Sequence, residues 1–137
     1  MRRRLLAVAA VSVVVGFVGC GDLAGPNTDF YGAYDLQTLN GNLLPTVVYQ
    51  DPSELDELMS ETFRIYTDGS YTDDFTLRVS GSSGQQTISR RDVGTYLRSG
   101  NTFQFRDGNN GQSFDGEIAG TTLTVTQNNN VYVYRRQ

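Results

Sequence analysis

From residue 30 onward, hydrophobic and polar residues alternate in short runs separated by turn residues. Alternation places successive side chains on opposite faces of a β-strand, so each run predicts a strand with one buried face. Asn40-Gly41 and Asp68-Gly69 lie between runs and favour tight hairpins, because these residues tolerate a positive φ. The pattern predicts an all-β domain, a small antiparallel up-and-down barrel of about eight or nine strands. The expected strands cover residues 31–39, 43–49, 61–67, 70–80, 86–98, 102–106, 112–118, 121–127 and 131–135.

One segment departs from this alternation. Residues 51–54, Asp-Pro-Ser-Glu, have the composition of a helix start: an aspartate cap, a proline suited to the first helical position and a glutamate able to reach back to the cap. Leu55, Leu58 and Met59 follow at helical spacing. We therefore expect one short helix, whose apolar side lies on the barrel or across its end.

The phase of the alternation also identifies the side chains expected inside the barrel. A barrel of about eight strands is just wide enough to be filled by side chains or to hold one small ligand, and both alternatives stay open here. If a cavity exists, its expected lining is Tyr34, Leu36, Phe63, Ile65, Phe75, Leu77, Tyr96, Phe103, Phe105 and Phe114.

Strict alternation turns four charged side chains inward as well: Asp73, Arg90, Asp92 and Arg98. Burying charges is expensive unless they pair with one another. Two interpretations stay open: a bulge or strand break that resets the phase, which we favour, and a polar cluster that grips a ligand. The opposite phase predicts an exposed face of mixed charge, with Arg64, Arg78, Arg106, Asp115 and Glu117.

The chain begins with a basic stretch, residues 1–4, and an apolar run over residues 5–18. This arrangement is typical of a secretory signal, and the run is shorter than the roughly 20 residues of a membrane span. It ends in Phe17-Val18-Gly19-Cys20, which resembles the lipobox of bacterial lipoprotein precursors. The resemblance implies a signal peptide over residues 1–19 and a Cys20 that is lipidated, as by palmitate. A flexible tether over residues 20–29 and a folded domain over residues 30–137 then follow.

Composition restricts the chemistry of the mature chain. After removal of residues 1–19, eight basic and fifteen acidic side chains remain, a net charge of −7, which argues against nucleic acid as a partner. The chain has no His and no Lys, and Cys20 is its only cysteine, so we expect no enzyme activity, no cofactor and no metal site. Residues 107–111, Asp-Gly-Asn-Asn-Gly, vaguely resemble a calcium loop. Gly111 offers no side-chain oxygen, so a hairpin turn explains the segment.

Several short motifs occur in order along residues 31–136. They are Gly32-Ala33-Tyr34-Asp35-Leu36, Asn40-Gly41, Leu44-Pro45, Asp68-Gly69-Ser70-Tyr71, Gly94-Thr95-Tyr96, Gly100-Asn101-Thr102 and Tyr132-Val133-Tyr134-Arg135-Arg136. In this order they resemble the bacterial lipocalin-like (calycin-type) lipoprotein family. Lipocalins place a tryptophan on the first strand and cover its ring with a basic side chain near the last strand. The resemblance implies that Tyr34 takes the tryptophan position and that Arg135 or Arg136 covers it, as a barrel-closing pair.

We therefore expect a lipid-anchored lipoprotein of the bacterial cell envelope whose lipocalin-like barrel is a non-catalytic binding module for a small apolar ligand. The alternative is a protein-interaction module, or a protease-inhibitor-like barrel, that acts through its rim and has a filled interior. The expected partners are the membrane, through the lipid anchor, and a small hydrophobic ligand or an envelope protein. Gly21, instead of Asp, after the cysteine favours the outer membrane, with the domain facing the periplasm or the cell surface.

Overall fold

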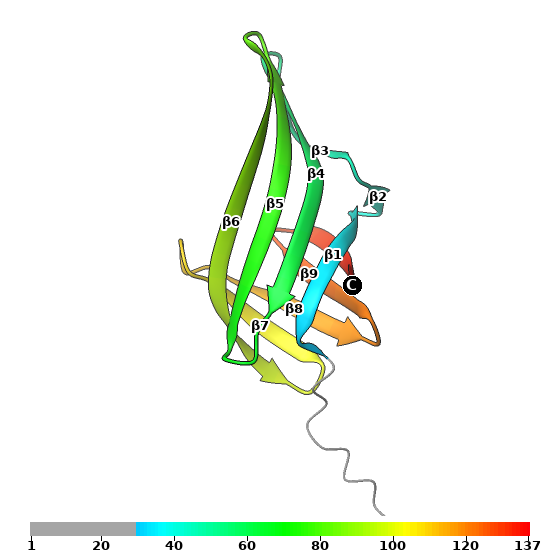
Figure 1. Cartoon of the computed structure of the whole chain (residues 1–137), viewed down its shortest axis with the longest axis vertical. Helices are drawn as coiled ribbons and strands as arrows, with labels where there is room; N and C mark the ends of the chain where they lie inside the picture. The colour runs from blue at the N-terminus through cyan, green and yellow to red at the C-terminus, as the bar shows by residue number, and fades with distance from the viewer. Residues whose placement is uncertain (1–29) are drawn as a thin grey trace, which may run out of the picture.

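The computed structural model describes residues 30–137, which form an all-β domain (Figure 1). The predicted antiparallel architecture is confirmed, and the Asn40-Gly41 turn has the expected positive φ values of 52° and 82°. Among the described residues, no helix has the length and apolar character needed to cross a membrane. The strands are β1 (Gly32–Leu39), β2 (Asn42–Leu43), β3 (Thr46–Gln50), β4 (Glu54–Ile65), β5 (Ser70–Gly81), β6 (Gly84–Ser99), β7 (Thr102–Asp107), β8 (Ser113–Ala119), β9 (Thr122–Gln127) and β10 (Asn130–Arg136).

Eight of these strands close into an antiparallel barrel. Strands β4 to β10 are neighbours in chain order, and β1 closes the barrel by pairing with β10 on one edge and with β4 on the other. At the centre of this closure, Tyr34 lies opposite both Arg136 and Phe63. Strands β2 and β3 are additional: β2 pairs with the end of β1, and β3 pairs with the first half of β4. Closure removes most of the free strand edges from the barrel itself.

The expected helix over residues 51–59 is wrong. Asp51 accepts hydrogen bonds from the backbone N–H groups of Ser53 and Glu54, as a helix cap would, but this turn leads into β4. A short helix is marginal by itself, whereas pairing with β3 and β5 gives the segment backbone partners on both edges. A bulge between Leu58 and Ser60 interrupts the alternation, so that Leu58 and Glu61 both face inward.

Three long strands extend beyond the closed barrel (Figure 1). β6 pairs with β7 only over residues 94–99, and β4 pairs with β1 only over residues 62–65. The remaining parts of β4, β5 and β6, together with β3, form a projecting sheet over residues 46–58 and 75–92, which we call the arm. Its tip is the β5–β6 turn, and its inner face continues the inside of the barrel.

Aromatic rings fill the lower part of the barrel. Phe63 stacks on Tyr71 with ring centroids 4.8 Å apart, and Phe105 contacts both rings edge-on at 5.0 and 5.3 Å. Two glycines make room for these rings. A Cβ on Gly94 would lie 2.5 Å from Cε1 of Tyr71, and a Cβ on Gly116 would lie 2.6 Å from Cε2 of Phe105. The core therefore depends on small residues at these two strand positions.

Candidate binding site

The ten side chains predicted to line the interior all lie on the inner side of the barrel or the arm. Tyr34, Leu36, Phe63, Ile65, Phe103, Phe105 and Phe114 are buried in the core, whereas Phe75, Leu77 and Tyr96 are half-buried against it. The rings of Phe103 and Phe114 stack on Phe105 at 5.6 and 5.3 Å. These aromatic side chains thus pack against one another in the lower barrel, and a role in contacting a ligand stays a prediction.

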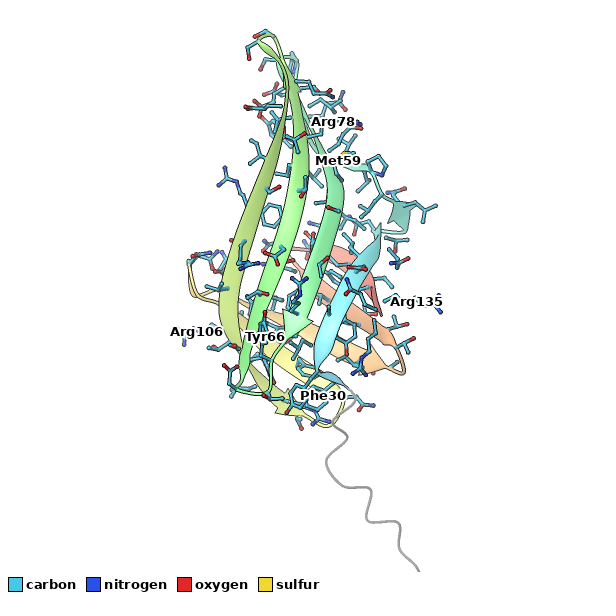
Figure 2. All side chains as sticks on the ribbon, viewed as in Figure 1. Phe30, Met59, Tyr66, Arg78, Arg106 and Arg135 are labelled. Carbon is cyan, nitrogen blue, oxygen red and sulfur yellow. The ribbon has the colours of Figure 1, made fainter. Side chains whose placement is uncertain are left out.

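At its lower end, the barrel is closed around Phe30, which we call the floor (Figure 2). The guanidinium of Arg98 lies 3.8 Å from the centroid of the Phe30 ring, a cation–π contact. Tyr34 donates a hydrogen bond to the Phe30 carbonyl at 2.7 Å. Of the two predicted covering arginines, Arg136 lies opposite Tyr34 in the sheet and donates to a neighbouring backbone carbonyl, whereas Arg135 is exposed. In the sequence, strict alternation already turned Arg98 inward, and this was the signal that its side chain lies at the floor.

At the upper end of the barrel, where the arm begins, three acidic side chains share the inner face. We call Glu61, Asp73 and Asp92 the carboxyl cluster. Asp73 on β5 lies directly opposite Asp92 on β6, and these two strands pair without any register shift over residues 70–81. The favoured explanation of a reset phase is therefore wrong for Asp73 and Asp92, and the bulge lies in β4 instead. Sequence reasoning missed Glu61, although it shares the inward phase of Phe63.

Hydrogen bonds connect some, but not all, of the polar atoms in the carboxyl cluster. The Tyr134 hydroxyl donates to Oε1 of Glu61. Asn109 donates from Nδ2 to Oδ1 of Asp92 at 3.1 Å. Oδ1 of Asp73 is buried and accepts no hydrogen bond from the described residues.

Burial dominates the electrostatics of the carboxyl cluster. Glu61 is only 7% exposed, and this burial raises its pKa from 4.5 to about 7, against the opposing effect of its hydrogen bonds. Burial also raises the pKa of Asp73 well above its usual range, and the nearby charges of Glu61 and Asp92 add to this shift. Burial likewise raises the pKa of Tyr134 well above its ordinary value. Burial therefore favours the protonated forms of Glu61 and Asp73.

The ion pairs among residues 30–137 all lie on the opposite, outer side of β4, β5 and β6. Asp74 forms ion pairs with Arg64 at 2.6 Å and with Arg91 at 2.5 Å, and Glu57 forms an ion pair with Arg78 at 2.7 Å. None of these arginines reaches the carboxyl cluster. This outer face confirms the expected exposed surface of mixed charge, and the acids inside the barrel lack a comparable partner.

A concavity lined by both polar and apolar side chains lies on the outside of the barrel. It is a groove of about 630 Å³ that crosses strands β6 to β9, with Leu97, Gln104, Asp115 and Glu117 among its walls. Leu97 is 73% exposed, and the polar side chains here keep their contact with water. Polar groups in contact with water do not lower the stability of the fold, whereas buried carboxyls without charged partners do lower it. We therefore take the carboxyl cluster, rather than this groove, as the candidate site.

The remaining sequence predictions concern metal ions and the lipid anchor. Residues 107–111 form a hairpin turn in which Asp107 accepts hydrogen bonds from the backbone N–H groups of Asn109 at 2.6 Å and Asn110 at 3.4 Å. In the described part of the chain, no three His, Cys, Asp or Glu side chains are placed to hold a metal ion. Cys20, the signal peptide and the tether lie outside the described residues.

The fold and the site define a class: a closed, eight-stranded antiparallel β-barrel with a carboxyl cluster at its upper end. No family model and no curated protein matches this chain. It is similar to the crystal structure of an uncharacterized protein from Bacteroides eggerthii, with 12% sequence identity and a TM-score of 0.47. The alignment covers 80% of this chain and 100% of that one. A likeness at this level indicates neither a family nor a function, so membership of the lipocalin-like lipoproteins stays a prediction.

Proposed function

We propose that this protein is a lipid-anchored binding module of the bacterial cell envelope, with no catalytic role. The carboxyl cluster is the observation on which the binding role depends, because buried acids without counter-charges lower stability and are typical of functional sites. The anchor is supported by the signal-like segment that ends in Cys20. The absence of His and Lys from the whole sequence supports binding rather than catalysis.

An anchor at Cys20 would set the orientation of the barrel. Phe30 lies at the floor, at the opposite end of the domain from the tip of the arm (Figure 2). Ten residues of fully extended chain reach at most about 36 Å. The floor would therefore stay near the membrane, and the arm and the carboxyl cluster would face away from it. A binding face in this position is accessible to solutes of the surrounding compartment.

The inner face of the arm offers an apolar surface directly above the carboxyl cluster. Leu58, Leu77 and Ile88 lie side by side across β4, β5 and β6, and the latter two are half-buried. Phe75 lies between these residues and Asp73 on the same face of β5. A small ligand with an apolar portion fits this surface, in agreement with the function expected from the sequence. Its polar end would meet the carboxyl cluster.

Labelling with a palmitate analogue in a bacterial host tests the anchor. We expect the wild type to incorporate the label and to partition with membranes, because the acyl chains bind the bilayer. The variant Cys20→Ser should lose both properties. A wild-type protein without label would contradict the anchoring part of the proposal.

Mass spectrometry of small molecules that co-purify with the detergent-extracted protein tests the binding role. The wild type and the variant Asp73→Asn are purified in parallel, so that contaminants appear in both samples. A compound enriched only with the wild type supports the proposal. Identical profiles from the two proteins contradict it.

A second candidate function, protein interaction through the rim, is favoured by the free edge of β3. Among the strands of residues 30–137, this strand pairs only with β4, and Val47, Val48 and Tyr49 are 50%, 44% and 50% exposed. Such an edge fits an added strand from an extended segment of an envelope protein. The variant Val47→Lys should then abolish cross-linking to that protein and leave binding at the carboxyl cluster unchanged. Unchanged cross-linking would contradict this candidate.

A further inference from the structure

We propose that the carboxyl cluster binds the cationic end of a small organic ligand, a primary ammonium or a guanidinium group, whose apolar portion lies along the inner face of the arm. This inference rests on the proposed function and names the ligand class of its site. It depends on an unpartnered oxygen, an uncompensated charge and the chemistry of the neighbouring side chains.

The first observation is the buried Oδ1 of Asp73, which has no hydrogen-bond donor among the described residues. Buried polar atoms in folded proteins nearly always have a partner, and an exception calls for an explanation. Asp73 is not isolated, because it lies opposite Asp92 and the charges of Glu61 and Asp92 both act on its carboxyl. An N–H group of a ligand would supply the donor that the protein itself does not provide there.

The second observation is the imbalance of charge on this face. Glu61, Asp73 and Asp92 come together from three adjacent strands, and each ion pair of residues 30–137 lies on the other side of the sheet. Arg90 is the basic side chain nearest along β6 on the inner face. It is exposed, lies opposite Phe75 rather than Asp73, and takes part in none of these ion pairs. A bound cation would balance the charge of the cluster.

The neighbouring groups favour an organic cation over a metal ion. Burial raises the pKa of Glu61 to about 7 and so favours its protonated form, whereas metal ligands must be deprotonated, and no three acids of the described residues are placed to hold a metal ion. Ammonium and guanidinium groups donate to ionised and neutral carboxyls alike. Tyr132 and Tyr134 stack beside the cluster with ring centroids 6.4 Å apart, and aromatic rings attract organic cations. These features together match a hydrogen-bonding cation attached to an apolar body.

Partial exposure gives a ligand access from the side of the arm. Asp73, Asp92 and Tyr132 are half-buried, whereas Glu61 beneath them is buried. Two further inner-face residues of β5 follow Asp73 toward the tip, ending at Leu77, about 14 Å away along the strand. An unbranched chain of six carbons is shorter than this distance. The n-hexylammonium ion is therefore a suitable probe.

Isothermal titration of the full-length, lipidated protein in nonionic detergent tests the inference. We expect n-hexylammonium to bind at least tenfold more tightly than n-hexanol, and n-hexanoate to show no binding, because the three probes differ only in the charge of the polar end. Asp73→Asn and Asp92→Asn should each weaken n-hexylammonium binding at least tenfold. Asp115→Asn, the same change on the outer face of β8, is the matched control and should change affinity less than twofold.

Three results would overturn the inference. Equal affinity for the ammonium and the alcohol would leave an apolar binding module without cation recognition. Unchanged binding in both cluster variants would place the cation elsewhere. If no probe binds while palmitate labelling succeeds, the anchor stands and the cluster holds protons only. Circular dichroism reports whether Asp73→Asn folds, and the half-buried Asp92 provides the deciding variant if it does not.

Discussion

Burial of Glu61 gives this domain an unusual pH dependence of stability, which the single substitution Glu61→Gln should remove. The pKa of Glu61 is raised from 4.5 to about 7, so the folded state holds this proton more tightly than the unfolded state does. Below about pH 4.5 the side chain is protonated in both states, so its burial as a charged group does not lower the free energy of unfolding. As the pH rises from about 4.5 to about 7, the folded state loses stability, and above pH 7 the loss is complete.

The magnitude follows from the size of the shift. A change of about 2.5 pKa units corresponds to about 3 kcal/mol of unfolding free energy. Glutamine has nearly the same shape and keeps an oxygen that can accept the hydrogen bond from Tyr134, but it cannot ionise. We therefore expect the variant Glu61→Gln to be about 3 kcal/mol more stable than the wild type at pH 8. At pH 4.5 the two proteins should differ by less than about 1 kcal/mol.

Urea denaturation between pH 4.5 and pH 8, followed by circular dichroism, measures this difference. The raised pKa of Asp73 acts in the same direction, so the slope of the variant should be smaller than that of the wild type without vanishing. Glu117→Gln is the matched control, because Glu117 is exposed on the outer face of β8. The reasoning is refuted if the wild type is more stable at pH 8 than at pH 5.5, or if Glu61→Gln and the control behave alike.

Four further substitutions test other parts of the structure by thermal denaturation. Gly94→Ala would place a Cβ 2.2 Å from a backbone carbonyl oxygen, so we expect a loss of more than about 3 kcal/mol. A Cβ at Gly100 would face open space, so Gly100→Ala should lose only about 1 kcal/mol of unfolding free energy, because of the positive φ at this position. A similar loss in both glycine variants would contradict the close packing at Gly94. Arg98→Ala removes the cation–π contact with Phe30 and should cost about 1 kcal/mol, and no change would argue against that contact. Asp74→Asn breaks two ion pairs and should cost about 1 kcal/mol at neutral pH, less in 1 M salt; a cost independent of salt would contradict the electrostatic origin.

The interior of the barrel was largely predictable because alternation is a local property. Phe63, Phe105 and Phe114 were assigned to the inside from period-two spacing, and each is buried. Turn chemistry is equally local, and Asn40-Gly41 has the conformation that its side chains favour. The helix prediction failed because β4 pairs with both β3 and β5, and the bulge after Leu58 was likewise not predictable from the local spacing. An extra residue in one strand has no reliable local signal.

The sequence by itself determined which aromatic and aliphatic side chains face inward, where most chain reversals occur, and that the chain lacks histidine and lysine. Only the tertiary structure decided which inward side chains meet. Glu61 and Tyr134 form a hydrogen bond across 73 residues of sequence, and Asp73 lies opposite Asp92 because β5 and β6 pair in one particular register. Strand register and barrel closure result from contacts between distant segments, and a one-residue slip would turn each of these side chains to the other face. The candidate site is therefore a product of closure: the acids were visible in the sequence, and their meeting was not.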